Sequence, residues 1–294
     1  MIMKFFWFFL PFILLYPLIG LDSSFYLLRL SRVLTAFFVG GGLCLLTLNL
    51  QNITRNPLAS EYTLGISAGA SFTASLGLIL GFSPAFFGML GGIGSTLLLF
   101  FFLRKKLKSS SLILFGILLN VFFSSGIYFL NYLTSFKVSQ SLSRWVFGGF
   151  SFYSFQEVVL ISFSAFVLLV FSLREHPKIA LLGIAEIYEE ILGRAFRKKL
   201  FLLFLLIGFF ITLSITLSGP LPFFALLFAN FFRLATKGNP VKHILFSFFG
   251  GGFFLTTLDT FGRWINPLEE IPIGIITGIL GLPFMAFLIF KEKP

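Results

Sequence analysis

The chain has 294 residues, of which 57 % are hydrophobic and 11 % are charged, and its mean hydropathy is +0.99. A soluble domain carries roughly 25 % charged residues, so a chain this apolar cannot cover a surface in contact with water. The composition therefore excludes a soluble globular protein and predicts an integral membrane protein. The net charge of +11 is interpreted as a difference between loops, because Lys and Arg remain on the cytoplasmic side of a membrane; no nucleic-acid partner is expected.

The apolar runs have the length of membrane-spanning helices, and the two-residue alternation of a membrane barrel is absent. We therefore predict an all-α polytopic membrane protein, a single domain over 1–294 with about ten transmembrane helices. The first run is expected to be a retained span, because it lacks the small-x-small cleavage site of a signal peptide. In chain order the expected spans are 4–20, 32–50, 62–81, 85–103, 111–133, 153–173, 199–217, 220–235, 243–261 and 272–290.

The distribution of basic residues tests this topology. With both termini in the cytoplasm, the ten spans place 17 of the 22 Lys and Arg residues inside, which is the bias that membrane proteins follow. Three arginines near span ends fall outside: Arg29, Arg32 and Arg263. They could extend to lipid head groups, or they could form an external electropositive patch for an acidic partner protein.

The stretch 174–199 is the one long polar segment between two apolar blocks, and the topology places it in the cytoplasm. Within it, Leu181–Phe196 has apolar residues at helical spacing, which predicts an amphipathic helix. Glu186, Glu189 and Glu190 form its polar side, and Gly193 is expected to end it. A helix lying on the lipid surface is the alternative, although three glutamates facing anionic lipid disfavour it.

Sequence motifs for catalysis are absent. The chain has no G-x-x-x-x-G-K-[ST] phosphate loop, no H-E-x-x-H and no G-x-S-x-G. His176 and His243 have no second ligand at metal spacing, and Cys44 is the only cysteine. Asp259 is the only ionisable residue expected well inside a span, whereas an ion-coupled carrier usually keeps several. We expect no catalytic residue, no metal site and no cofactor in this chain, and an energy source outside it.

Glycines occur where helices could approach each other closely. Gly40, Gly41 and Gly42 lie in one expected span, and the pairs Gly65–Gly69 and Gly274–Gly278 lie in two others. Helix packing is the expected role of these glycines, and backbone flexibility for gating stays open as an alternative.

Two segments carry motifs that resemble a known family. The first is 29–70, with R-L-x-R at its start, then Gln51, Arg55-Asn56-Pro57-Leu58-Ala59, Leu64-Gly65 and Gly69-Ala70. The second is 218–290, with Ser218-Gly219-Pro220, Arg233, Asp259, Arg263, Glu270-Ile271-Pro272-Ile273-Gly274 and Gly278-x-x-Gly281-x-Pro283-Phe284. In order and spacing these motifs resemble the FecCD-type permease subunits of type II ABC importers.

The resemblance implies a type II ABC importer permease in the bacterial cytoplasmic (inner) membrane. It implies a homodimer with the translocation path at the dimer interface, a separate ATPase dimer that binds ATP and Mg on the cytoplasmic side, and a substrate-binding protein outside. The cargo would be an iron-siderophore, haem or cobalamin. Walls built mainly of Phe and Leu suit such a bulky chelate better than a bare metal ion, which needs Asp, His or Glu ligands.

The resemblance also implies roles for three sets of residues. The ATPase would be coupled through Leu182, Gly183, Glu186, Glu189, Glu190 and Gly193. The binding protein would dock on Arg29, Arg32 and Arg263. A cytoplasmic gate would be formed by Asn56, Pro57 and Leu58.

The chain departs from the family pattern at three places. Ala229-Asn230 replaces a Pro-His pair, Ala225 replaces a glycine, and Ser60-Glu61 replaces an acidic residue followed by proline. The altered span at 220–235 keeps one alternative open, a degenerate permease that serves as a structural membrane subunit. The other alternative is a secondary carrier or channel without an ATPase, which a buried charge array would favour.

Overall fold

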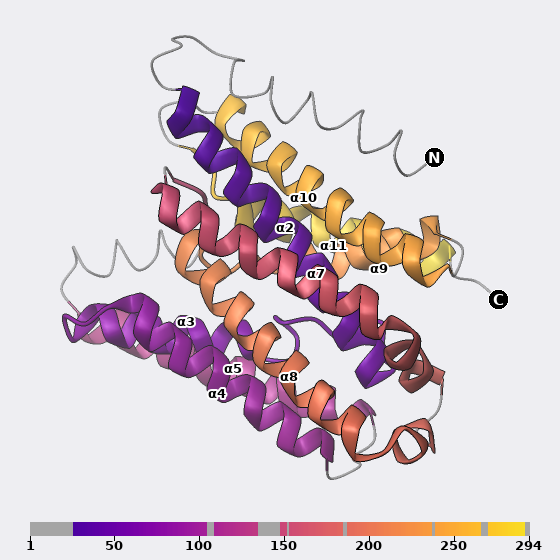
Figure 1. Cartoon of the computed structure of the whole chain (residues 1–294). Helices are drawn as coiled ribbons and strands as arrows, with labels where there is room; N and C mark the ends of the chain where they lie inside the picture. Colours follow the sequence, from indigo (N-terminus) through magenta and orange to yellow (C-terminus); the bar gives the residue numbers. More distant parts are fainter. Residues whose placement is uncertain are drawn as a thin grey trace.

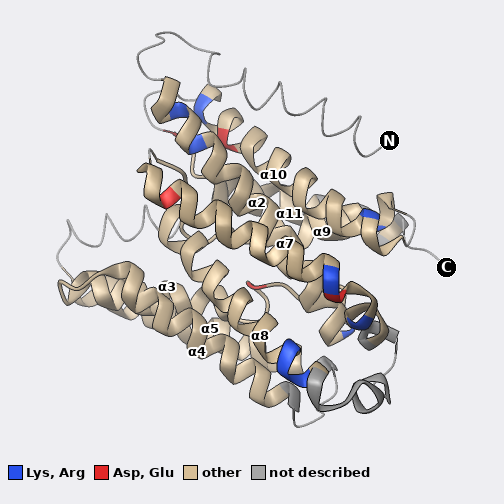
Figure 2. Ribbon diagram, in the orientation of Figure 1, with Lys and Arg blue, Asp and Glu red and all other residues tan. Residues whose placement is uncertain are grey.

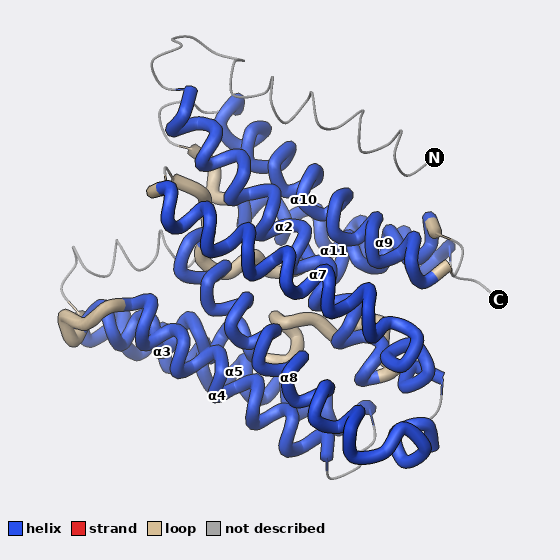
Figure 3. The backbone as a smooth tube through the Cα atoms, viewed as in Figure 1, coloured by secondary structure: helices blue, strands red, loops and turns tan. Residues whose placement is uncertain are grey.

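The structure, a computed structural model, describes residues 26–104, 109–134, 148–151, 153–184, 187–236, 239–265 and 270–291. Within these ranges every regular element is an α-helix, as Figure 3 shows. The helices are α2 (Tyr26–Thr54), α3 (Ile66–Ile79), α4 (Pro84–Arg104), α5 (Ser109–Leu133), α7 (Phe155–Ile184), α8 (Ile187–Ser218), α9 (Phe224–Ala235), α10 (Pro240–Ile265) and α11 (Ile273–Lys291).

Each described helix coincides with one expected span. Among the described residues, six helices are long and apolar enough to cross a membrane, whereas α3 and α9 are shorter apolar helices. The expected span at 4–20 lies outside the described residues, so the count of ten helices stays a prediction. The expected spans 153–173 and 199–217 were too short, because α7 continues to Ile184 and α8 begins at Ile187.

The helices form two groups joined by α8 (Figure 1). In one group α2 packs against α7, α9 and α10, and α11 packs against α9 and α10. In the other group α3 packs against α4 and α5, and α8 lies between the groups, in contact with α4 and α7. Charged residues gather toward the two ends of the helices and are sparse along their middles (Figure 2), as expected of helices surrounded by lipid.

Glycines bring α2 and α10 into direct backbone contact. A Cβ atom added to Gly40 would lie 2.5 Å from the carbonyl oxygen of Gly251, and one added to Gly251 would lie 2.7 Å from that of Gly40. Gly41 faces the Phe248 carbonyl oxygen in the same way, at 2.5 Å. The glycines of α2 therefore serve helix packing, as the sequence predicts. In contrast, Gly278 of α11 faces open space in the described part of the chain.

Candidate functional site

The end of the bundle at which α2 starts holds a buried ion-pair network. Asp259 accepts hydrogen bonds from Nε and Nη2 of Arg32 at 3.0 and 2.7 Å. Arg32 also donates to both carboxylate oxygens of Glu270, at 2.9 and 2.7 Å. Asp259 further pairs with Arg263 at 3.4 Å. Because α2 carries Arg32 and α10 carries Asp259, the network fastens these two helices together at this end.

The network changes the role expected of Arg32. Its side chain is only 6 % exposed and both of its partners are carboxylates, so it does not present a free charge to a docking protein. Arg32 is thus buried against its counterions Asp259 and Glu270, which a buried guanidinium needs, and its expected role in docking stays a prediction. Arg29 is partly exposed and the Arg263 side chain is 27 % exposed, so both of these arginines reach the surface at the end of the bundle where docking is expected.

The loop that leads into α7 is tied down at the same end. Gly149 donates its N–H to the Ser218 carbonyl oxygen at 2.7 Å, and Ile273 donates to that of Gly148 at 3.1 Å. The Tyr153 hydroxyl donates to the carbonyl oxygen of Leu217 at 2.7 Å. Burial raises the pKa of the Tyr153 phenol to about 12, so it remains a neutral donor. The loop therefore closes over the ends of α8 and α11.

At the opposite end of α2 lies the turn expected to form the cytoplasmic gate. Arg55 ends the helix with φ of 52°, a left-handed conformation that a non-glycine residue rarely adopts. The side-chain oxygen of Asn56 accepts the Leu58 N–H at 2.9 Å, which folds the turn on itself. Leu58 is 46 % exposed. The structure thus brings Asn56, Pro57 and Leu58 together in one compact turn.

The Pro57 carbonyl oxygen is held from two sides. Gln51 of α2 and Asn230 of α9 each donate a side-chain N–H to it at 2.9 Å. Sequence reasoning marked Asn230 only as a departure from the family pattern, yet this residue connects α9 to the turn. The contact joins positions 173 residues apart, so no local spacing could have indicated it.

A buried carboxylate follows the turn. Glu61 is 3 % exposed and accepts a hydrogen bond from the Thr47 hydroxyl of α2 at 2.9 Å. The expected span 62–81 begins just after Glu61, and the burial of Glu61 was not predicted. In the structure α3 starts only at Ile66, so Glu61 lies in the turn before α3, where it bonds to Thr47 of α2. Gly65, with φ of 75°, provides the left-handed residue from which α3 begins.

The polar segment 174–199 is divided between two long helices. The expected separate helix at 181–196 is not found: its described parts belong to the end of α7 and the start of α8. Gly193 does not end a helix, because α8 continues through it. Glu186 lies outside the described residues, as do the side chains of Leu182, Glu189 and Glu190; the coupling role therefore stays a prediction.

An ion pair and a proline shape the same end of α7. Glu175, which is 5 % exposed, pairs with Lys199 of α8 and with Lys178. Pro177 lies inside α7 and has no N–H to give to the Leu173 carbonyl oxygen. The Nδ1 atom of His176 lies 3.1 Å from that oxygen and can donate to it, so this histidine restores a bond that the proline removes.

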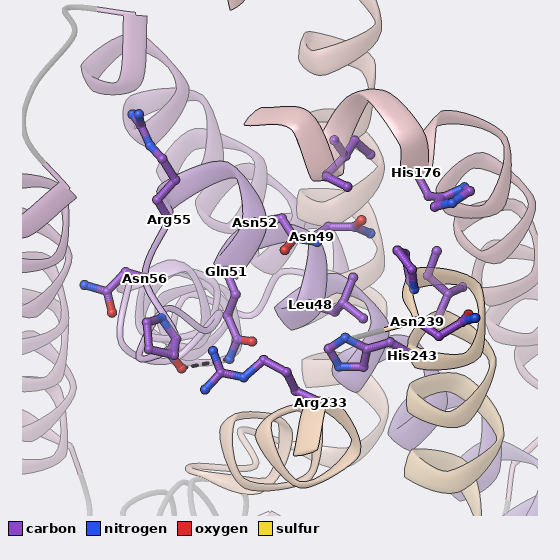
Figure 4. Close-up of a pocket in the computed structure, with 15 residues that line it drawn as sticks. Leu48, Asn49, Gln51, Asn52, Arg55, Asn56, His176, Arg233, Asn239 and His243 are labelled. Atoms are coloured by element: carbon purple, nitrogen blue, oxygen red, sulfur yellow. Dashed lines mark hydrogen bonds between the residues drawn. The ribbon is translucent and has the colours of Figure 1, made fainter. Parts of the chain in front are cut away.

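A cavity of about 400 Å³ opens between α2, α7, α9 and α10, and Figure 4 shows its walls. Its described lining contains Arg55, Arg233, His176 and His243, together with the side-chain amides of Asn49, Gln51, Asn52, Asn56 and Asn239. No Asp or Glu is among the described lining residues. The fold thus brings both histidines of the chain to one cavity next to the Asn56–Pro57 turn.

Comparison with known proteins gives consistent results. A model described as the FecCD transport family matches residues 20–291. The Fe(3+)-citrate import system permease protein YfmE of Bacillus subtilis (strain 168) is 31 % identical over 287 residues, covering 94 % of this chain and 85 % of YfmE. The molybdate import system permease protein MolB of Haemophilus influenzae is 29 % identical over 273 residues, covering 90 % of this chain and 80 % of MolB.

A solved structure described as an inward-facing conformation of a metal-chelate type ABC transporter has a TM-score of 0.84 and 25 % identity, covering 97 % of this chain and 98 % of the other. A bundle of membrane-spanning helices with these relatives defines a multi-pass permease subunit of an ABC importer. The chain belongs to the FecCD transport family, which confirms the resemblance in its motifs. It is a transport component rather than an enzyme.

Proposed function

We propose that this permease works as a homodimer that moves a bulky metal chelate, of iron-siderophore, haem or cobalamin type, into the cytoplasm. The energy comes from a separate ATPase dimer, and a binding protein delivers the cargo from outside. The observation that carries this proposal is the agreement of 97 % of the chain with the metal-chelate type transporter at a TM-score of 0.84.

The surface of α5 supports a path shared with a second copy. This helix has the smallest buried share among the six candidate spans, 17 %. One run of it exposes Ile117, Leu118, Val121 and Phe122. A path between two such apolar surfaces would bind a chelate weakly as a whole and would not strip off its metal.

The connection between α7 and α8 supports coupling to the ATPase. The ATPase would bind Leu182, Gly183, Glu186, Glu189, Glu190 and Gly193. The Glu175–Lys199 pair joins the two helices beside this segment, so a push on the segment would move both helices together. On the outside the binding protein would dock on Arg29 and Arg263, and on the inside Asn56, Pro57 and Leu58 would close the exit.

Reconstitution tests the proposal. The permease, its ATPase and its binding protein are placed in proteoliposomes, and ATP-dependent uptake of ferric siderophore, ferric citrate, haem, cobalamin and molybdate is compared. We expect uptake of at least one chelate and none of molybdate. Uptake of molybdate alone would overturn the cargo, and failure to form a complex with the ATPase would overturn the assembly.

The coupling residues have a separate test. Charge reversal of the three glutamates, Glu186→Lys, Glu189→Lys and Glu190→Lys, should leave ATP hydrolysis but abolish uptake. The reason is that the surface on which the ATPase is expected to bind would then repel it. The triple variant Lys291→Glu, Arg104→Glu and Lys242→Glu changes as many charges outside the segment and serves as control. Unchanged uptake in the glutamate variant would contradict the assignment.

A further inference from the structure

Three acidic side chains are buried in the described part of the chain, and only two of them are balanced by a cation. Asp259 pairs with Arg32, and Glu175 pairs with Lys199. Glu61 is 3 % exposed and makes no ion pair within the described ranges. A buried carboxylate without a counterion is costly, and such a group takes up a proton instead. Glu61 therefore differs in kind from the other two.

The groups that face Glu61 carry no charge. Thr47 of α2 donates its hydroxyl to the carboxyl at 2.9 Å, and the buried thiol of Cys44 on the same helix lies close enough to interact with it electrostatically. The helix that follows, α3, contains no ionisable residue. Asn120 of α5 and Phe223 before α9, which contact the residue after Glu61, are uncharged. No neighbouring cation therefore stabilises an ionised Glu61.

Glu61 joins the turn expected to form the cytoplasmic gate to two helices. Its side chain bonds to α2, and its carbonyl oxygen accepts the N–H groups of the first two residues of α3 at 3.0 and 3.2 Å. Only Ala59 and Ser60 separate Leu58 from Glu61, and both are buried. Because this connection is so short, a movement of the turn away from α2 would bring Glu61 into contact with water.

We propose that Glu61 holds a proton while the turn is packed and releases it to water when the turn opens. Burial without a counterion raises the pKa of this carboxyl, which lies in the loop outside both helices, from 4.5 to about 7, because the charged form loses its hydration. Contact with water would restore the ordinary value. The inference rests on the proposed function only in treating the turn as the gate.

Opening of the turn depends on pH through this proton. Between pH 4.5 and about pH 7, the packed turn binds a proton that the open turn does not, so a rise in pH favours the open turn by up to about tenfold per unit. Above this window Glu61 is ionised in both states, and the preference becomes constant. The open turn should therefore gain about tenfold between about pH 6 and about pH 8.

Infrared spectra of the purified full-length permease test whether Glu61 is protonated. The carbonyl band of a protonated carboxyl that is missing in Glu61→Gln is followed from about pH 5 to about pH 9, and it should fade with a midpoint near pH 7. Thr47→Val removes a hydroxyl that stabilises the carboxylate and should move the midpoint to higher pH. Thr256→Val, whose hydroxyl bonds within α10, is the control and should leave it unchanged.

Thiol labelling tests the connection to the turn. Ala59 is 0 % exposed, so Ala59→Cys provides a thiol that a maleimide reaches only when the turn opens. The unaltered chain is the blank, because Cys44 is its only cysteine and is 0 % exposed. The labelling rate of Ala59→Cys, divided by that of Ala59→Cys with Glu61→Gln, should rise about tenfold between about pH 6 and about pH 8. The ratio cancels the pH dependence of the thiol itself.

Two results would overturn the proposal. A Glu61 carboxyl that is ionised over the whole pH range would remove the proton site, and a constant labelling ratio would remove its connection to the turn. If thermal unfolding shows that Glu61→Gln is not folded, an unchanged band midpoint in Thr47→Val would contradict the proton site by itself. Neither measurement uses ATPase or cargo, so a failure of uptake in proteoliposomes would contradict the proposed function and leave these results unaffected.

Discussion

The two ends of α2 are packed in different ways. At the starting end, Arg32 is buried between Asp259 and Glu270, and the charges neutralise one another. At the other end, α2 and the Asn56–Pro57 turn line a cavity of about 400 Å³. A buried ion pair fixes the position of the helices that carry it, whereas a cavity leaves the surrounding side chains room to move. The first end therefore holds the helices together, and the second leaves space between them.

The largest expected effect is the loss of Asp259. Asp259→Ala leaves Arg32 buried with only the partly exposed Glu270 beside it and should lower the free energy of unfolding by about 3–5 kcal/mol. Chemical unfolding in detergent micelles measures it. Glu270→Gln is the matched control and should have a smaller effect, because the Glu270 side chain is 44 % exposed. Equal effects would show that the network is not a structural clamp.

The middle of α2 is in direct backbone contact with α10. Gly251→Ala places a methyl group 2.7 Å from the Gly40 carbonyl oxygen, so the backbones must separate, and stability should fall by about 1–3 kcal/mol. Gly94→Ala is the control, because a Cβ atom there meets nothing within 4 Å; it should be neutral or slightly stabilising. Thermal unfolding of the two variants tests this, and similar melting temperatures would contradict the tight contact.

The cavity end should respond in function more than in stability. Asn230→Ala removes the donor to the Pro57 carbonyl oxygen and should lower stability by about 1 kcal/mol. The loosened turn should raise the number of ATP molecules hydrolysed per cargo molecule in proteoliposomes. Thr236→Val, whose hydroxyl bonds only within or beside its own helix, is the control. An unchanged ratio of ATP hydrolysed to cargo transported would contradict a role of Asn230 in holding the turn expected to form the gate.

The smallest effect is expected at the external surface. Arg263→Glu should weaken binding-protein docking several-fold in dilute buffer, and the difference should shrink at about 1 M salt, where charges are screened beyond about 3 Å. Surface binding assays at two salt concentrations measure it, with Lys242→Glu at the opposite end as control. A loss that does not depend on salt would point to misfolding rather than to a docking patch.

The helices could be predicted because apolar length is a local property. Each of the nine helices in the described ranges coincides with an expected span, and the motif match over 29–290 agrees with the family model over 20–291. Arg29, Arg32 and Arg263 were placed correctly near one end, because span alternation needs only the order of segments. The polar ends of α7 and α8 were misjudged, because a helix that leaves the membrane keeps its backbone bonds while its composition changes.

The partners of buried polar residues could not be predicted. Arg32 and Asp259 are 227 positions apart, so spacing gave no reason to pair them, and Arg32 was assigned to the surface. His176 and His243 were dismissed singly because neither has a local partner, and only the fold brings them to one cavity. The hydrogen bond of His176 to the backbone could have been inferred from its neighbour, because Pro177 leaves a carbonyl oxygen without its usual N–H donor.

The glycine contact between α2 and α10 has a mechanical consequence. Where two backbones are in direct contact, no side chain can change its rotamer to absorb a displacement, so the two helices move as one rigid unit. One end of this unit carries the Arg32–Asp259 ion pair, and the other carries walls of the cavity. A tilt imposed at the Arg32–Asp259 end would therefore be transmitted along both helices to the cavity.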